Sequence, residues 1–188
     1  MLAAHKKIGA DMTGFQSKRD MANSRDPIRW IENVSMSDAI LGRHYDAGVN
    51  SLLIRIQDPA TEFRPVQFPF KDIHEFQFLD AEDADGFPDE CKISDHQANS
   101  LVLILKQALL NHTNVVVHCH AGICRSGAVV EVATMMGFTA TDKFRMPNLR
   151  VKHKMMKALG WTYDENEKQT FTNGHVTESG IVLPNGDF

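Results

Sequence analysis

The stretch HCHAGICRSG, residues 118–127, contains the side chains best suited to covalent chemistry in this sequence. It follows the run NVVV and leads into AVVEVATMM, an order that predicts a strand, a short loop and a helix. Backbone amides converge at such a turn, and a helix beginning near Ser126 adds the positive end of its dipole. The pattern therefore predicts a concave anion site that suits a tetrahedral phosphate.

Two side chains of this loop can act on a bound anion. Arg125 carries a permanent charge and parallel N–H donors that match phosphate oxygens. Cys119 lies at the expected floor of the site, where the loop amides, the helix terminus and Arg125 favour the thiolate form. A thiolate is a competent nucleophile at neutral pH. Gly122 supplies the backbone freedom that lets the loop fold back on itself.

The stretch HCHAGICRSG resembles the His-Cys-x-x-Gly-x-x-Arg-Ser/Thr signature of cysteine-dependent protein tyrosine phosphatases. The dual-specificity branch, with its small bacterial and phage-type members, is the better match because its loop lies late in the chain after a valine-rich strand. The resemblance extends in weaker form over residues 50–160. The matching signature positions are His118, Cys119, Ala121, Gly122, Arg125 and Ser126.

This resemblance implies two-step hydrolysis of a phosphomonoester with no metal or cofactor. Cys119 is expected to attack phosphorus, while Arg125 and the loop amides stabilise the charge on the equatorial oxygens. Ser126 is expected to hydrogen-bond the departing thiolate, and His118 to support the loop. The residues expected around the phosphate are His120, Ala121, Gly122, Ile123, Cys124 and Arg125.

The leaving oxygen needs a proton, so a carboxylic acid is expected near the loop. In the family this aspartate follows a strand and precedes the helix before the signature. Asp80 ends HEFQFLD and fits that place best, although Cys119 follows it by 39 positions, more than the family commonly shows. An insertion in AEDADGFPDE explains the length. It leaves Asp83 and Asp85 as alternatives, with Asp89 also a candidate.

The second cysteine of the loop, Cys124, allows two interpretations. Under oxidation it forms a disulfide with Cys119 and protects the nucleophile from irreversible over-oxidation. Alternatively, it is a small buried residue that fills space. Cys91 lies in a polar stretch and is interpreted as an incidental thiol.

Composition limits the partners and the location. The chain has 188 residues and a formal net charge of -4, which disfavours nucleic acid and anionic membranes. It has no apolar run near the ~20 residues of a membrane span and no secretory signal pattern. We therefore expect a cytoplasmic protein. The resemblance implies a phosphorylated protein as the substrate, with phosphotyrosine favoured and dual specificity as the alternative. The sequence leaves the oligomeric state open.

Three other functions remain as alternatives. A zinc site is disfavoured because the cysteines and histidines lack ligand spacing. A rhodanese-like sulfur transferase also uses a loop cysteine, but it does not need Arg125-Ser126 at this spacing. A non-enzymatic phospho-ligand binding module keeps the anion cradle but has no use for Cys119.

The strands and helices expected around this loop alternate along the chain. This alternation predicts a single α/β domain, with a short, mostly parallel sheet flanked by helices. The phosphatase domain is expected over residues 27–160, after a polar lead-in at 1–26 and before an extension at 161–188. A buried segment is expected at 28–36, with strands at 50–57, 74–80 and 114–118. Helices are expected at 37–48, 93–111, 126–137 and 147–160.

Overall fold

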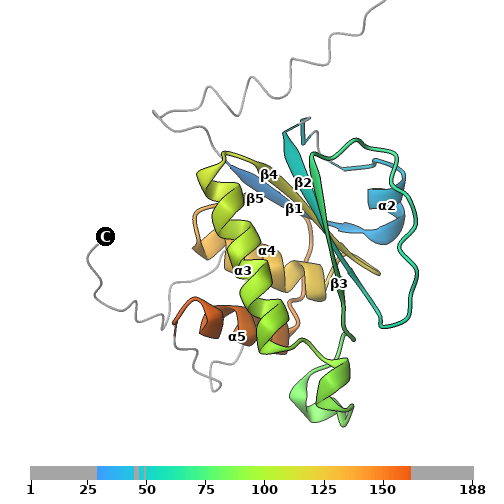
Figure 1. Cartoon of the computed structure of the whole chain (residues 1–188), viewed down its shortest axis with the longest axis vertical. Coiled ribbons are helices and arrows are strands. Elements are labelled where there is room, and N and C mark those ends of the chain that lie inside the picture. Colours follow the sequence, from blue (N-terminus) through green and yellow to red (C-terminus); the bar gives the residue numbers. More distant parts are fainter. Residues whose placement is uncertain (1–28, 45–46, 49, 162–188) are drawn as a thin grey trace, which may run out of the picture.

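A computed structural model describes residues 29–44, 47–48 and 50–161, which form one α/β domain (Figure 1). The expected lead-in and almost all of the expected extension lie outside these residues. The elements are β1 (Trp30–Ser35), α2 (Met36–Ile40), β2 (Ser51–Gln57), β3 (Asp72–Gln77), the 3₁₀ turns η2 (Asp83–Asp85) and η3 (Asp89–Cys91), α3 (Asp95–Leu110), β4 (Asn114–Cys119), α4 (Arg125–Met135), β5 (Thr139–Ala140) and α5 (Leu149–Ala158).

The sheet has the strand order β3-β2-β4-β1-β5, and every pairing is parallel. This confirms the expected fold class. The central strand β4 lies between β1 and β2, and Val115, Val116 and Val117 in it are fully buried. A strand that is buried on both faces has a continuous run of apolar residues. This is why β4 could be predicted from its valines.

Two hydrophobic clusters cover the two faces of the sheet. The larger one joins the sheet to α3, α4 and α5 through residues such as Leu101, Val129 and Met155, and these helices lie on one side in Figure 1. The smaller one contains Trp30 and Leu53, with the segment 66–70 packed against it, near α2 on the other side. The sheet is thus a middle layer whose strand ends remain available for a site.

The expected helix at 37–48 is wrong at both ends, because α2 covers only Met36–Ile40. Its N-cap is Ser35, whose hydroxyl accepts a hydrogen bond from the Asp38 amide at 3.1 Å. The chain then reaches Gly42, which has a φ of +67°. This left-handed conformation ends the helix before Gly48.

The other helices match the expected ones apart from one or two residues at each end. Serine followed three residues later by glutamine is a capping-box pattern, and Ser94 and Gln97 form this box at the start of α3. The signature helix α4 begins at Arg125, one residue earlier than expected. The last helix, α5, begins at Leu149 because Asn148 is its N-cap.

The strand expected at 74–80 is displaced, because β3 spans Asp72–Gln77. It pairs with β2 up to Gln57, and the pairing ends where β2 ends. The predicted alternation holds, since Phe76 and Phe78 are both buried. As a result, Asp80 lies beyond the strand in the segment that leads to α3. The two-residue strand β5 carries no pattern and was not predicted.

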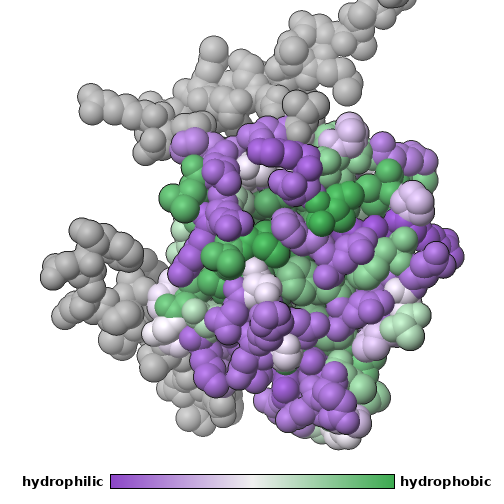
Figure 2. Space-filling view, viewed as in Figure 1, coloured by the Kyte–Doolittle hydropathy of each residue, from purple (hydrophilic) through white to green (hydrophobic). Residues whose placement is uncertain are grey.

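Polar side chains cover much of the face in Figure 2, including the projection at the bottom of the view, where Figure 1 draws the segment with η2 and η3. The residues of that segment from 83 to 90 are exposed, as expected for the acidic loop. None of the helices in the described part of the chain is long and apolar enough to cross a membrane.

Candidate active site

The candidate nucleophile Cys119 is the last residue of β4 and is only 1% exposed. Its register partner in β1 is Ser35, which is also the last residue of its strand. The sulfur therefore lies at the carboxyl edge of the sheet, where loops of parallel α/β folds build their sites. The Ser126 hydroxyl lies 3.2 Å from the Cys119 sulfur. These two predicted site residues are brought together by the turn into α4.

Gly122 is required where the structure places it. Its φ is +76°, and a Cβ on it would lie 2.3 Å from the Val34 carbonyl carbon and 2.5 Å from the Ser35 amide. No side chain fits such a gap, because the obstructing atoms are backbone. The loop thus packs directly onto the end of β1.

The carbonyl groups of the loop are bound by surrounding elements. In a trans peptide bond, the C=O of one residue and the N–H of the next residue point in opposite directions. The amides of Ala121, Ile123 and Arg125 are therefore turned away from those elements, into the loop. The hydrogen bonds that hold the carbonyls run from Met36 N to His120 O (3.1 Å), from Asn33 Nδ2 to Gly122 O (2.8 Å) and from Asn148 N to Cys124 O (3.1 Å).

Arg125 is almost fully buried, with 3% of its side chain exposed. Its Nη1 donates hydrogen bonds to Asp58 Oδ1 at 2.7 Å and to the Phe78 carbonyl at 2.8 Å. Its Nε has no hydrogen-bond partner among the described residues, and lies 3.7 Å from Asp80 Oδ2. One edge of the guanidinium is thus fixed, while a buried donor remains available to an anion.

Asp80 is the candidate acid that the structure places at the loop. Besides facing Arg125, it accepts a hydrogen bond on Oδ1 from Asn148 Nδ2 at 2.9 Å. The Cys124 thiol lies close enough to Asp80 for the carboxylate charge to raise the pKa of the thiol. Its side chain is 34% exposed, so one carboxyl group faces both the loop and the solvent.

The alternative aspartates have partners elsewhere. Asp83 forms an ion pair with Arg150, which also lies 3.3 Å from Asp89. Asp85 Oδ2 accepts a hydrogen bond from the Glu82 amide at 2.6 Å and so caps η2. These contacts attach the acidic loop to α5 and to itself.

Cys124 is half-buried, and all three cysteines, including Cys91, are free thiols. The pKa of Cys124 is raised to about 11, mainly by burial and also by the charge of the neighbouring Asp80. At neutral pH this group is a thiol and a hydrogen-bond donor. A thiol attacks an oxidised Cys119 more slowly than a thiolate does, so this pKa disfavours the protective disulfide.

His118 is fully buried, and its pKa is lowered to about 4, chiefly because burial penalises the charged imidazolium. Its Nε2 accepts a hydrogen bond from Arg55 Nε at 3.2 Å, so its proton is on Nδ1, 3.3 Å from the Cys119 carbonyl oxygen. Arg55 in turn donates to Glu75 at 2.9 Å and to the Arg64 carbonyl at 2.6 Å. A neutral His118 thus supports the end of β4, where it was expected.

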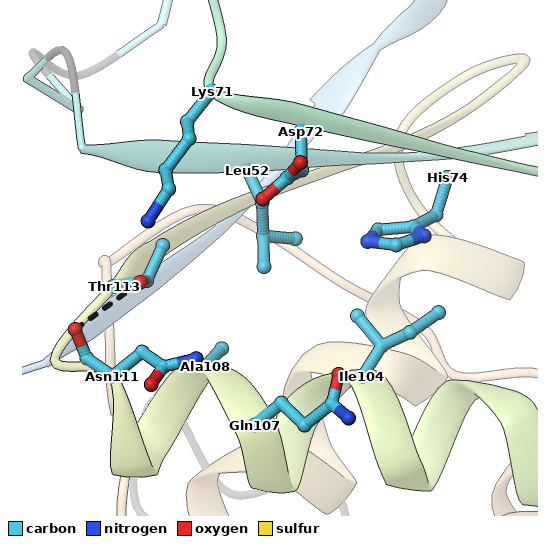
Figure 3. A pocket seen from close by; sticks show the side chains of 9 residues that line it. All are labelled: Leu52, Lys71, Asp72, His74, Ile104, Gln107, Ala108, Asn111 and Thr113. Atoms are coloured by element: carbon cyan, nitrogen blue, oxygen red, sulfur yellow. Dashed lines mark hydrogen bonds between the residues drawn. The ribbon is translucent and has the colours of Figure 1, made fainter.

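The remaining loop residues differ in exposure. His120 and Ala121 are exposed, and Ile123 is half-buried. A cavity of about 230 Å³ adjoins this part of the loop, between the end of β1 and Phe144. A second cavity of about 50 Å³ lies between the starts of β2 and β3 and the end of α3, at the opposite edge of the sheet (Figure 3).

Three polar residues at the site were not identified as site residues from the sequence, namely Asp58, Arg55 and Asn148. Asp58-Pro59 signalled a turn, and the proline-asparagine pair before α5 signalled a helix start, but neither pattern indicates a contact with the loop. In the described residues, no three His, Cys, Asp or Glu side chains are grouped so that they could hold a metal ion.

Neither a protein-family model nor a curated protein matches the chain. Among solved structures, the chain is similar to OH1 from the Orf virus, a tyrosine phosphatase described as having distinct structural features and triple substrate specificity. The sequence identity is 13%, the alignment covers 76% of this chain and 94% of that chain, and the TM-score is 0.39.

Proposed function

We propose that this chain hydrolyses phosphomonoesters through a cysteinyl phosphate formed on Cys119. The observation that carries the proposal is the Nε of buried Arg125, at the end of a loop that starts at Cys119. This Nε has no hydrogen-bond partner among the described residues and only a long ion-pair contact of 3.7 Å with Asp80 Oδ2. A buried cationic N–H that makes no hydrogen bond is costly unless a ligand accepts one. Phosphate oxygens, which accept strong hydrogen bonds from guanidinium groups, meet that need.

In the first step, the Cys119 thiolate attacks phosphorus, a P–S bond forms and the P–O bond to the leaving group breaks. Arg125 Nε and the inward amides stabilise the negative charge on the equatorial oxygens. Asp80 Oδ2 gives its proton to the leaving oxygen. The position of this oxygen near Arg125 supports the role, whereas Asp83 is paired with Arg150.

In the second step, water attacks the phosphorus of the cysteinyl phosphate. The Asp80 carboxylate accepts a proton from that water, the P–S bond breaks and phosphate leaves. The electron pair of this bond returns to sulfur, where the Ser126 hydroxyl, 3.2 Å away, donates a hydrogen bond to the thiolate. The two steps together use the side chains of Cys119, Arg125, Asp80 and Ser126 and require no redox change.

The substrate class that fits best is a phosphotyrosine side chain in a protein. Cys119 is 1% exposed, so a phosphate must reach a recessed sulfur. A phosphotyrosine ring is long enough to carry the phosphate into such a site, whereas phosphoserine and phosphothreonine are shorter. We expect a higher kcat/KM for a phosphotyrosine peptide than for the phosphothreonine peptide of the same sequence.

The test is steady-state hydrolysis of p-nitrophenyl phosphate by the full chain and by Cys119→Ser. The variant should lose about three orders of magnitude or more in turnover, because a serine hydroxyl is a far weaker nucleophile here. Cys91→Ser is the matched control, since it makes the same substitution outside the loop and should leave turnover unchanged.

Full turnover by Cys119→Ser would contradict the proposal. So would a wild-type chain that binds phosphate but never hydrolyses the ester, which is the behaviour of a phospho-ligand binding module. Release of sulfite from thiosulfate, with thiocyanate formed when cyanide is added as the sulfur acceptor, would instead favour sulfur transfer.

A further inference from the structure

Asn148 connects three parts of the candidate site. It immediately precedes α5 and is 4% exposed. Its amide N–H donates to the Cys124 carbonyl at 3.1 Å, which attaches it to the signature loop. Its side-chain Oδ1 accepts from the Val151 amide at 3.0 Å, and its Nδ2 donates to Asp80 Oδ1 at 2.9 Å. The residue thus links the helix, the loop and the candidate acid.

These contacts fix which way the Asn148 amide points. The Val151 amide is a donor, so the atom facing it must be the side-chain oxygen. The NH₂ group then has to face Asp80. Because Oδ1 of Asp80 is occupied by this hydrogen bond, the carboxyl is held with Oδ2 toward Arg125 Nε, 3.7 Å away.

We propose that Asn148 is a positioning residue that orients Asp80 for proton transfer to the leaving group. The inference rests on the proposed hydrolysis and adds the residue on α5 that controls its acid step. Asn148 keeps its own protons throughout. The transferred proton is the one on Asp80 Oδ2, which moves to the leaving oxygen as the P–O bond breaks, and Oδ1 continues to accept from Nδ2.

Helix capping alone does not explain the residue type. Ser35 and Ser94 cap α2 and α3 with a hydroxyl, and serine, aspartate and asparagine are about equally good at an N-cap. Of these three, only asparagine combines an acceptor for the helix with an NH₂ donor for a carboxylate. Asp80 lies beyond the end of β3 and its side chain is 34% exposed, so the strand does not hold it in place. The hydrogen bond from Asn148 Nδ2 fixes its orientation instead.

The test substitutes Asn148→Ser, which keeps an N-cap oxygen for α5 but is too short to donate a hydrogen bond to Asp80. Hydrolysis is measured with phenyl phosphate, whose leaving group needs an acid, and with 2,4-dinitrophenyl phosphate, whose leaving group does not. We expect about a tenfold loss of kcat for phenyl phosphate and less than a twofold change for the dinitrophenyl ester, because only the first depends on proton donation.

Two controls separate positioning from stability. Ser94→Ala removes the cap of another helix and should lower the melting temperature without changing the ratio of the two rates. In the Asp80→Asn background, Asn148→Ser should cause no further loss with phenyl phosphate, because the acid it orients is already absent.

An equal loss with both esters, or no loss with either, would overturn the inference, as would an effect that multiplies with Asp80→Asn. Such results leave the proposed hydrolysis standing, since the wild-type chain would still turn over both esters. A wild-type chain that hydrolyses neither ester would overturn the proposed function, and this inference with it.

Discussion

The two edges of the parallel sheet hold their polar groups in different ways. At the carboxyl edge, Arg125 is buried and fixed on one side, while its Nε has no hydrogen-bond partner in the described chain. At the amino edge, the small cavity in Figure 3 is lined by Lys71, Asp72 and His74, of which the first two are exposed and the third is half-buried. These three side chains reach the solvent, which costs little and supplies no preorganised charge.

The difference shows what to look for in a site of this kind. A cavity by itself is weak evidence, since the amino edge has one and most of the polar side chains around it are exposed. Buried polar groups held by several elements are stronger evidence, because folding places them there at a cost. The carboxyl edge has such groups in His118 of β4 and in Arg125 and Ser126 of α4.

Among the residues that surround Cys119, the largest effect is expected from changing the buried cation. Arg125→Lys should reduce kcat/KM for p-nitrophenyl phosphate by about 10²- to 10³-fold, because an ammonium cannot contact Asp58, Phe78 O and a phosphate in the same planar arrangement. Steady-state kinetics measures the loss.

The matched substitution at the amino edge is His74→Ala, because His74 lines the small cavity there. It should change neither turnover nor melting temperature measurably, as expected for a substitution away from buried contacts. A comparable loss of turnover at both edges would contradict the contrast between them.

A smaller and more selective effect is expected for the acid. Asp80→Asn should reduce kcat for phenyl phosphate by about 10²-fold, whereas Asp83→Asn should have little effect, because Asp83 pairs with Arg150 and Asp80 faces Arg125. Leaving-group dependence measures this difference. If Asp83→Asn produced the large loss, the general acid would have to be reassigned.

The smallest effect concerns stability and pH. The pKa of His118 is lowered from 6.5 to about 4 in the folded chain, so its neutral form stabilises the fold above pH 6.5. That contribution decreases as the pH falls through this window, because the unfolded chain binds the proton first. The total is about 3 kcal/mol, since each pKa unit corresponds to about 1.4 kcal/mol.

Urea unfolding at pH 7 and at pH 4 measures this dependence. His118→Asn has no titrating group at this position, so its free energy of unfolding should depend less steeply on pH. An identical pH dependence in the variant and the wild-type chain would show that His118 is not buried in its neutral form.

The signature loop could be predicted because its residues are close in sequence. Gly122, Arg125 and Ser126 all follow Cys119 within seven positions, and a valine strand on one side and a small-residue helix on the other define the turn. The central strand and the capping box of α3 could be predicted for the same reason, since their signals are local.

The contacts that complete the site could not be predicted, because they join distant segments. Asp58 and Arg125 are 67 positions apart, and Asn148 and Asp80 are 68 positions apart. Periodicity and capping rules describe neighbours within a few residues and contain no information on such pairs. The end of α2 was also predicted wrongly. A glycine can end a helix, and the sequence does not show whether Gly42 or Gly48 does so.

The central claim is that phosphorus is transferred to the sulfur of Cys119. The most direct measurement is mass spectrometry of Asp80→Asn mixed with 2,4-dinitrophenyl phosphate, quenched within one turnover and digested. Without the base for the second step, one phosphoryl group is predicted on the peptide that contains Cys119. Turnover without any phosphorylated cysteine peptide, or a phosphoryl group on another residue, would contradict the account.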